Sequence, residues 1–278
     1  MAMNEAELKV IANKLRLDVI EMTSAAGSGH PGGSLSAADF MATLYFRVMN
    51  HRPDDPQWDG RDRFVLSKGH AAPILYASLA ESGYFPVEEL LTLRKINSRL
   101  QGHPVRGKVP GVEMSTGSLG QGLSMACGMA IASKMDSKNH HIYCLLGDGE
   151  LQSGMNWEAA MFASHYDLCN LIAFVDRNSL QIMGNTEDVI GLDPLADKWK
   201  AFGWRVKSID GHNIGQIIKA CAWAKKASKK PSMIILNTVK GRGVSFMENN
   251  ADFHGKCCNQ EETKCAEKEI AEAMRNVR

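Results

Sequence analysis

The segment from Gly147 to Asn178 constrains the fold of this chain more than any other stretch. Residues 141–147, HIYCLLG, are apolar and rich in strand-forming side chains, and residues 170–176, NLIAFVD, repeat that pattern. The helix-compatible segment SGMNWEAAMFASHY separates the two runs. A strand–helix–strand unit of this kind has a right-handed crossover and pairs its strands in parallel. The sequence therefore predicts an α/β fold, a parallel sheet with helices on both faces.

Polar residues follow both of these strands directly. The triplet Gly147-Asp148-Gly149 ends the first strand, and Asn178 follows the second, thirty positions after Asp148. Because parallel strands end at the same edge of a sheet, Asp148 and Asn178 are expected to lie side by side. A carboxylate and an amide oxygen suit a hard divalent cation bound to a diphosphate, and the glycines let the backbone approach phosphate groups. The alternative is an ordinary Asp-Gly turn followed by an unrelated loop asparagine.

Helix-like and strand-like segments alternate along the rest of the chain. Apolar residues at helical spacing predict helices, and short apolar runs predict strands. The expected helices are 5–24, 36–49, 71–82, 123–135, 193–202, 214–227 and 260 onward, and the expected strands are 63–67, 204–210 and 232–240. No repeat or long linker interrupts them, so we expect one domain over 1–278 with helices at both ends. The glycine-rich segment 25–33 is expected to be a flexible loop outside the core.

The composition argues against nucleic acids and membranes as partners. The formal net charge is +1 and there is no basic stripe for nucleic acid to bind. No apolar run approaches the roughly 20 residues needed to cross a membrane, and the N-terminus lacks the apolar region of a signal peptide. Seven cysteines are scattered without a Cys-x-x-Cys pair, which favours reduced thiols and a cytoplasmic protein.

Four histidines occupy separate loops, each beside a glycine or a proline: His30, His70, His103 and His254. A single loop histidine is usually an exposed side chain without a role, but these four loops are predicted to share one edge of one sheet. Imidazoles with a pKa of about 6–7 suit a step that takes and returns a proton. A zinc site is a weaker interpretation, because no two of these histidines have the close spacing of metal ligands.

Several longer motifs resemble one family of enzymes. GDG followed about thirty residues later by NSLQ resembles the thiamine diphosphate signature, and GDGELQSGMNWEAAMFASHYDLCNLIAFVDRNSLQIMG resembles transketolase in particular. The motifs SGHPGG, LSKGHAAPILYASLAESGY, GHP, STGSLGQG, TVKGRG and FHG occur in the order in which transketolases carry them. The resemblance covers nearly the whole chain and implies a thiamine diphosphate-binding fold.

The resemblance implies roles for particular residues. Magnesium or calcium would be bound by Asp148, Asn178 and the backbone carbonyl of Leu180. Residues that would contact or enclose thiamine diphosphate are Gly149 and His70 at the diphosphate, and Gly117, Ser118, Leu119, Lys240, Gly33 and His254 around the cofactor. The catalytic candidates, which would face the sugar hydroxyls, are His30, His103 and His254.

The resemblance also implies an activity that needs a second chain. Transketolases are usually more than twice as long as this sequence, which stops after the diphosphate-binding domain. We therefore expect a two-chain transketolase of the pentose phosphate pathway, which transfers a two-carbon ketol unit from a ketose phosphate to an aldose phosphate. The expected partner carries the pyrimidine-binding and C-terminal domains, and two copies of each chain would form a heterotetramer.

Three alternatives stay open. A 2-oxo-acid dehydrogenase component shares GDG and the later asparagine but lacks the SGHPGG, SKGH and GHP loops. A non-catalytic paralogue would bind the cofactor or a partner without turnover. A transketolase-like enzyme for another sugar phosphate would share all of these motifs.

Two residues depart from the pattern of the family. Ser153 stands where glutamate is common near the interface that links paired sites, so a carboxylate link between sites is in doubt. Ser179 stands where glycine is common after the metal-binding asparagine, and we expect only a slight change of loop geometry. The apolar faces of the helices after Gly120 and Ser153 suit the interface with a partner chain.

Overall fold

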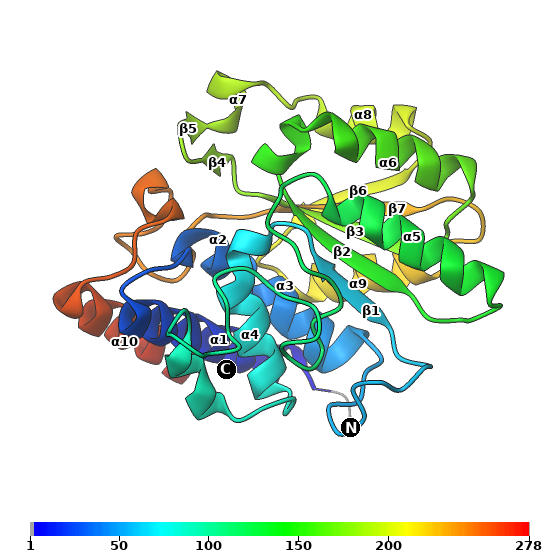
Figure 1. Cartoon of the computed structure of the whole chain (residues 1–278). Helices are drawn as coiled ribbons and strands as arrows, with labels where there is room; N and C mark the ends of the chain where they lie inside the picture. Colours follow the sequence, from blue (N-terminus) through cyan, green and yellow to red (C-terminus); the bar gives the residue numbers. More distant parts are fainter. Residues whose placement is uncertain (1–2, 278) are drawn as a thin grey trace.

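The fold is built on one parallel sheet. The computed structural model describes residues 3–277, and its central sheet has five strands (Figure 1). The strands are β1 (Arg63–Leu66), β2 (Ile142–Gly147), β3 (Leu171–Arg177), β6 (Arg205–Asp210) and β7 (Ser232–Asn237). Their order across the sheet is β1-β2-β3-β7-β6, and each neighbouring pair is parallel. The predicted α/β fold with a parallel sheet is confirmed.

Helices cover both faces of this sheet (Figure 1). One face carries α1 (Glu5–Ala26), α3 (Ala38–Thr43), α4 (Ala72–Glu81) and α9 (Ile214–Lys225), with α10 (Gln260–Arg275) packed against α1; the other carries α5 (Gly122–Met135), α6 (Gly154–His165) and α8 (Leu195–Ala201). Side chains of β2 alternate between the two cores, with Tyr143 and Leu145 on the α1 side and Cys144 and Leu146 on the α5 side. Because both faces are buried, these strands are continuous apolar runs.

Local sequence signals set the ends of the first and last helices. The Asn4 side chain accepts a hydrogen bond from the Glu7 N–H at 3.0 Å, and the Glu7 carboxylate accepts one from the Asn4 N–H at 2.7 Å. Asn259 and Glu262 form the same reciprocal pair at the start of α10. Gly27 ends α1 in the left-handed region, with φ at 62°. These caps explain why both helices begin where the sequence predicts.

The glycine-rich segment 25–33 departs from its prediction. It was expected to be a flexible loop outside the core, but Pro31–Leu35 forms a short helix, α2, whose residues are all buried. A Cβ on Gly32 would lie 2.8 Å from the backbone oxygen of Phe253, so α2 approaches that backbone at a distance that only glycine permits. Glycine serves close packing here, and the expectation of a flexible loop was wrong.

Several short elements were not expected from the sequence. A hairpin of β4 (Leu180–Gln181) and β5 (Gly184–Asn185), followed by α7 (Thr186–Val189), comes after β3. Single 3-10 turns cover Gly69–Ala71, Val87–Thr92, Gly149–Gln152 and Ala251–His254, and a π-helical turn, Leu44–Val48, extends α3. None of the helices within residues 3–277 is both long enough and apolar enough to cross a membrane.

Candidate functional site

A cavity of about 270 Å³ opens where the central strands end, and the loops after β1, β2, β3 and β7 form most of its wall. Nine of the residues that the sequence predicted for the site line it: Gly33, His70, Leu119, Asp148, Gly149, Asn178, Leu180, Lys240 and His254. Gly117 and Ser118 do not line it. Gly117 lies against the ring of His103, where a Cβ would come within 2.8 Å, and Ser118 is exposed.

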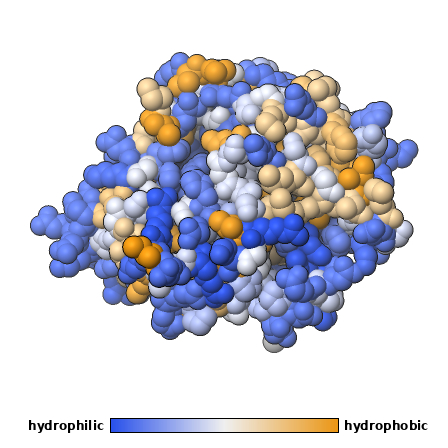
Figure 2. Space-filling view, viewed as in Figure 1, coloured by the Kyte–Doolittle hydropathy of each residue, from blue (hydrophilic) through white to orange (hydrophobic). Residues whose placement is uncertain are grey.

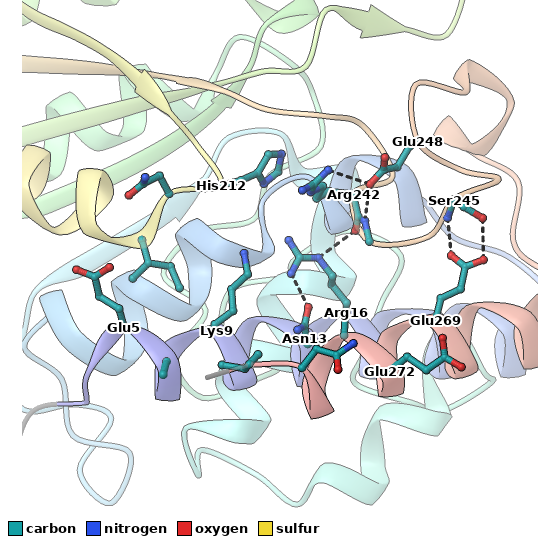
Figure 3. Close-up of a pocket in the computed structure, with 17 residues that line it drawn as sticks. Glu5, Lys9, Asn13, Arg16, His212, Arg242, Ser245, Glu248, Glu269 and Glu272 are labelled. Carbon is teal, nitrogen blue, oxygen red and sulfur yellow. Dashed lines mark hydrogen bonds and ion pairs between the residues drawn. The ribbon is translucent and has the colours of Figure 1, made fainter.

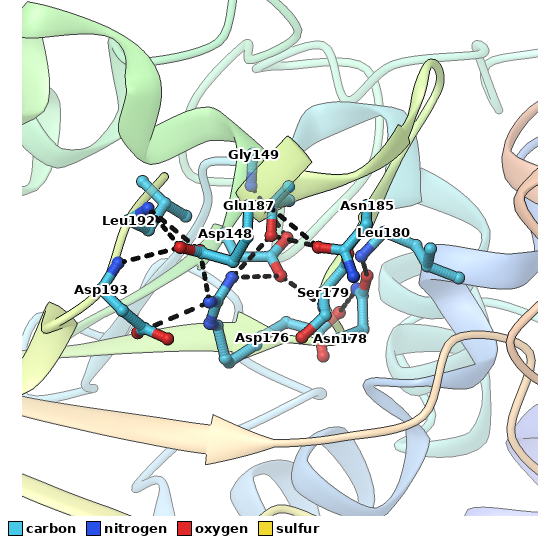
Figure 4. Close-up of polar contacts among 12 residues, drawn as sticks. Asp148, Gly149, Asp176, Asn178, Ser179, Leu180, Asn185, Glu187, Leu192 and Asp193 are labelled. Atoms are coloured by element: carbon cyan, nitrogen blue, oxygen red, sulfur yellow. Dashed lines mark hydrogen bonds and ion pairs between the residues drawn. The ribbon is translucent and has the colours of Figure 1, made fainter. Parts of the chain in front are cut away.

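Asp148 and Asn178 meet at adjacent strand ends, as the topology of the unit predicts (Figure 4). The buried Asp148 carboxylate accepts hydrogen bonds from the N–H groups of Gly149 at 2.8 Å and Ser179 at 2.6 Å. The Asn178 Oδ1 accepts from the Leu180 N–H at 3.1 Å. Burial, together with the neighbouring carboxylate of Asp176, raises the pKa of Asp148. A cation bound there would offset the electrostatic cost of ionising this buried carboxyl group. A carboxylate, an amide oxygen and the Leu180 carbonyl are the kinds of oxygen that Mg²⁺ or Ca²⁺ binds, and the Leu180 carbonyl also accepts from Lys240 Nζ at 3.1 Å.

Arg177 is a residue of this edge that sequence reasoning missed. Its guanidinium donates to Thr186 Oγ1 and to Glu187 Oε1, both at 2.7 Å, and lies 3.5 Å from Asp148 Oδ2. Glu187 in turn accepts from the Leu192 N–H at 3.0 Å. Arg177 therefore fastens α7 and the following loop to the edge that carries Asp148. No motif signalled this, because the contacts form only when the segment after β3 folds back over the strand ends.

A second missed feature is a buried ion pair beneath the cavity. Lys68 is 1% exposed, and its ammonium donates to the Gly33 carbonyl at 2.6 Å and to Asp176 Oδ2 at 2.5 Å. Asp176 also accepts from Ser36 Oγ at 2.6 Å and from the Asn178 amide at 3.0 Å. Burial would raise the pKa of Asp176, but the Lys68 ammonium and these hydrogen bonds outweigh burial and lower it. The pair joins β1, α2 and β3 and sets the orientation of the Asn178 amide.

Replacing Lys68 with methionine is expected to lower the free energy of unfolding by about 3–5 kcal/mol, because Asp176 would stay buried without its countercharge. The folded-state pKa of Asp176 is lowered, so the stabilisation by the pair is present above the ordinary value of 3.8 and is lost as the pH falls below it. Urea unfolding at neutral pH measures the difference. Lys9→Met is the control: Lys9 is 37% exposed and its partner Asp39 keeps Arg16, so a loss below about 1 kcal/mol is expected. Equal losses in both variants would contradict the assignment.

Glu150 is the other acidic residue of the cavity wall, and it holds three loops together. Its buried carboxylate accepts from Ser67 Oγ, from the Gly120 N–H at 2.9 Å and from the Gly147 N–H at 3.0 Å. Burial raises the pKa of Glu150, and these donors oppose the rise. Since these three donors come from three different loops, Glu150 holds the loops of the site in position.

The structure brings the four loop histidines into one cluster. The ring centroid of His30 lies 5.4 Å from that of His70, 5.7 Å from that of His254 and 6.3 Å from that of His103. The rings of His70 and His254 are stacked at 5.1 Å. His30 and His103 do not line the cavity itself, but they lie directly beside the histidines that do.

The pKa values of these four rings differ from the prediction. We expected pKa values of about 6–7, but burial lowers the pKa of His30 to about 4, helped by Arg94, and that of His254 to about 3, helped by Lys240. The pKa of His103 is also lowered, and that of His70 lies well below its ordinary value. The expectation was wrong because the fold buries these rings and also brings cations close to them. At neutral pH all four rings are uncharged.

The zinc interpretation of these histidines gains no support. In the part of the chain that the structure describes, no three His, Cys, Asp or Glu side chains are placed to share a metal ion. The nearest side-chain partner of His254 is instead a cation, with Lys240 Nζ at 3.0 Å from Nδ1. The charges of Lys240 beside His254 and of Arg94 beside His30 disfavour a metal ion on these two rings.

Ser179 occupies a conformation that explains why glycine suits its position. Its φ is 64°, in the left-handed region, which costs a residue with a side chain roughly 1 kcal/mol. The backbone N–H still reaches Asp148, so serine preserves the loop at that cost.

Ser179→Gly is therefore expected to raise the free energy of unfolding by up to about 1 kcal/mol. Urea unfolding measures the change, with Ser124→Gly on the exposed side of α5 as the matched control. That substitution removes a side chain from an ordinary helical position and should lower stability by about 0.5–1 kcal/mol. A destabilised Ser179→Gly variant would show that the serine side chain has a role of its own.

A larger cavity of about 830 Å³ lies between α1, α10 and residues 242–248 (Figure 3). Its polar side chains are bonded to one another: Arg16 donates to the Arg242 carbonyl and to Asn13 Oδ1, both at 3.0 Å. Ser245 donates twice to the Glu269 carboxylate at 2.7 Å. None of the predicted site residues lines this cavity, so we assign the site to the smaller one.

The chain is similar to transketolase proteins over almost its whole length. Residues 8–273 match the family described as transketolase, thiamine diphosphate binding domain. The chain is 48% identical over 270 residues to the 6-deoxy-6-sulfo-D-fructose transketolase subunit SqwG of Clostridium sp. (strain MSTE9), covering 97% of this chain and 98% of that protein. It is 42% identical over 270 residues to an apulose-4-phosphate transketolase subunit of Actinobacillus succinogenes, covering 97% of each.

The similarity extends to solved structures. Transketolase from Campylobacter jejuni matches with a TM-score of 0.91 and 36% identity, over 97% of this chain and 43% of that one. The chain likewise spans 40% of the length of the mammalian transketolases that it matches. The fold and the site define an α/β domain whose cofactor cavity lies at the carboxyl edge of a parallel sheet. The chain belongs to the transketolase family and contains its thiamine diphosphate-binding domain.

Proposed function

We propose that this chain is the thiamine diphosphate-binding subunit of a two-chain transketolase. It transfers a two-carbon ketol unit from a ketose phosphate to an aldose phosphate when its partner is present. The observation that carries this proposal is the juxtaposition of the Asp148–Asn178 edge with four neutral histidines around one cavity. Family membership disfavours the alternative of a 2-oxo-acid dehydrogenase component.

The cavity residues divide into a metal edge and a cofactor wall. Asp148, Asn178 and the Leu180 carbonyl are proposed to hold Mg²⁺ or Ca²⁺, because they present a charged and two neutral oxygens. The proposed cofactor contacts are Gly149 and His70 at the diphosphate, with Gly33, Leu119, Lys240 and His254 around it, and Gly117 and Ser118 nearby. When bound, thiamine diphosphate supplies the electron sink for cleavage of a carbon–carbon bond.

The histidines are proposed to bind the sugar hydroxyls and to exchange protons with them. His30, His103 and His254 are uncharged at neutral pH, so each ring carries one N–H donor and one nitrogen with a lone pair. On His30 and His254 a cation already lies beside Nδ1, Arg94 on the first and Lys240 on the second. A neutral ring whose lone pair is not occupied by the protein can accept a proton from a hydroxyl during bond cleavage and return it, and a ring N–H can donate a hydrogen bond to a hydroxyl oxygen. The chain's own contribution is therefore to position the substrate and to move protons beside the cofactor.

An apolar surface over α5 and α6 is proposed to receive the partner chain (Figure 2). The exposed apolar side chains on these helices and just beyond them are Met135, Met155, Met161, Phe162 and Tyr166. An apolar patch of this kind on an otherwise polar protein typically marks a protein interface. The partner would carry the pyrimidine-binding and C-terminal domains, and a heterotetramer of two chains of each kind is part of the proposal. We also propose a cytoplasmic location, which the seven free thiols favour, and a place in the pentose phosphate pathway.

The names of two related proteins refer to sugars that carry an anionic group. One relative is named for 6-deoxy-6-sulfo-D-fructose and another for apulose 4-phosphate. This favours a second candidate, a transketolase for an unusual anionic ketose. The experiment that tests both is a screen in which this chain and its partner are mixed with thiamine diphosphate and Mg²⁺. Donors are xylulose 5-phosphate, fructose 6-phosphate, 6-deoxy-6-sulfo-D-fructose and apulose 4-phosphate, and products are detected by mass spectrometry. Cofactor binding without transfer from any donor would support a non-catalytic paralogue.

His103→Ala and His254→Ala are each expected to lower kcat in the reconstituted enzyme by about 10²–10⁴-fold, while cofactor affinity changes far less. Steady-state kinetics and calorimetric titration of thiamine diphosphate separate the two effects. His140→Ala is the control, because His140 precedes β2 at the opposite end of the strand from the cavity. If both site variants turned over at the wild-type rate, these histidines would have no part in the chemistry.

A further inference from the structure

Arg94 lies beside the histidine cluster but belongs to none of the motifs that define the site. One guanidinium nitrogen donates to Ser28 Oγ at 2.6 Å, and another lies 3.3 Å from His30 Nδ1. The two contacts fix the plane of the guanidinium between residues of the loop that follows α1. Arg94 itself has φ at 58°, in the left-handed region that non-glycine residues rarely adopt. The backbone is thus held in a costly conformation at the residue that reaches His30.

Gly102 makes room for this guanidinium. A Cβ built on Gly102 would lie 2.8 Å from Arg94 Nε and 3.0 Å from Nη2. The glycine of the Gly-His-Pro motif is therefore needed for space, and the space is occupied by the group that contacts His30. His103 follows Gly102 in the same motif. One short segment therefore makes room for Arg94 and also supplies His103, and both are neighbours of His30.

The chemistry of the contact determines where the His30 proton is. A guanidinium has only N–H donors and stays charged in proteins, so it can bond His30 Nδ1 only if that nitrogen carries a lone pair. The proton of the neutral ring must then be on Nε2. Within residues 3–277, no protein group bonds His30 Nε2, and Gly255 leaves space beside that nitrogen.

We propose that Arg94 is a positioning residue that locks His30 in the Nε2–H tautomer, so that His30 acts on the substrate as a hydrogen-bond donor and not as a base. This rests on the proposed function, because the oxygen that would accept this bond belongs to a sugar bound beside the cofactor. It also assigns the proton-accepting role to another member of the cluster. His103 suits that role, because it is exposed and no residue in 3–277 bonds its ring nitrogens.

The charges around His30 also keep its ring neutral. Arg94, His103 and Lys240 face the ring, and each disfavours its protonation, in addition to burial. The rings of His70 and His254 complete its surroundings and are themselves uncharged. No carboxylate is among these neighbours. Removing the Arg94 charge is thus expected to raise the pKa of His30.

The test measures the tautomer and the pKa of His30 by nuclear magnetic resonance on the full chain with isotope-labelled histidine. The His30 signals are assigned from a His30→Gln variant. In the wild type, we expect a single Nε2–H tautomer at neutral pH. In Arg94→Met, we expect a mixture of tautomers and a His30 pKa higher by about 1, the order that a single neighbouring charge produces. Arg106→Gln removes an exposed cation of the same segment and should leave both unchanged.

Gly102→Ala provides a second variant, in which every charge remains and only the guanidinium is displaced. It should change the tautomer and the pKa of His30 in the same direction as Arg94→Met does. If Arg94→Met does not fold, the result for Gly102→Ala alone tests the proposal. A wild-type His30 with its proton on Nδ1, or an unchanged tautomer and pKa in the folded variants, would overturn the proposal. These measurements need no partner and no substrate, so a failure to detect ketol transfer would count against the proposed function and not against this assignment.

Discussion

Asp148→Asn is expected to abolish the metal-dependent binding of thiamine diphosphate, weakening it by more than about 100-fold. Asparagine keeps the size of the side chain and can still accept the hydrogen bond from Gly149, but it removes the charge that would neutralise the cation. Alanine is a poorer choice, because it would also leave Arg177 and the Ser179 N–H without their partner. Calorimetric titration of the cofactor with and without Mg²⁺ measures the effect, and a cofactor-induced rise in Tm provides a second readout.

Asp193→Asn is the matched control for this substitution. Asp193 also lies 3.5 Å from the Arg177 guanidinium, but it is 66% exposed and does not line the cavity. It should bind the cofactor with nearly wild-type affinity. Wild-type affinity in Asp148→Asn itself would remove Asp148 from the proposed metal site.

The second large effect is expected when the partner is withheld: this chain alone, saturated with thiamine diphosphate and Mg²⁺, should show no ketol transfer. In this cofactor class, a carboxylate must stand beside the pyrimidine ring and share a proton with it. Of the two acidic residues in the cavity wall, Asp148 belongs to the metal edge, and Glu150 is bonded to Ser67, Gly120 and Gly147. Neither is free for that role, so the carboxylate would come from the second chain.

Transfer from a ketose phosphate, followed with a coupled assay, compares this chain alone, the partner alone and their mixture. Activity should appear only in the mixture and should saturate as the partner is added. Binding of thiamine diphosphate by this chain alone, measured by calorimetry, controls for an inactive preparation. Full turnover by the isolated chain would refute the two-chain proposal.

The architecture was predictable because its determinants are local. The apolar runs that became β2 and β3 are separated by one helix-sized segment, and this spacing favours a parallel pair with a crossover. Topology then places Asp148 and Asn178 together although they are thirty positions apart. The caps of α1 and α10 were likewise local signals. The close packing of Gly32 was not predictable, because a glycine that permits flexibility and one that permits contact look the same in sequence.

The sequence by itself therefore determined the sheet, its functional edge and most of the residues gathered there. Only the tertiary structure decided the electrostatic state of that edge. Lys68 and Asp176 are separated by 108 positions, and Arg94 and His30 by 64, so no local pattern connects either pair. The physical reason is that a pKa depends on burial and on charges brought close by the fold, and neither quantity is encoded in the residues on either side of a titrating group.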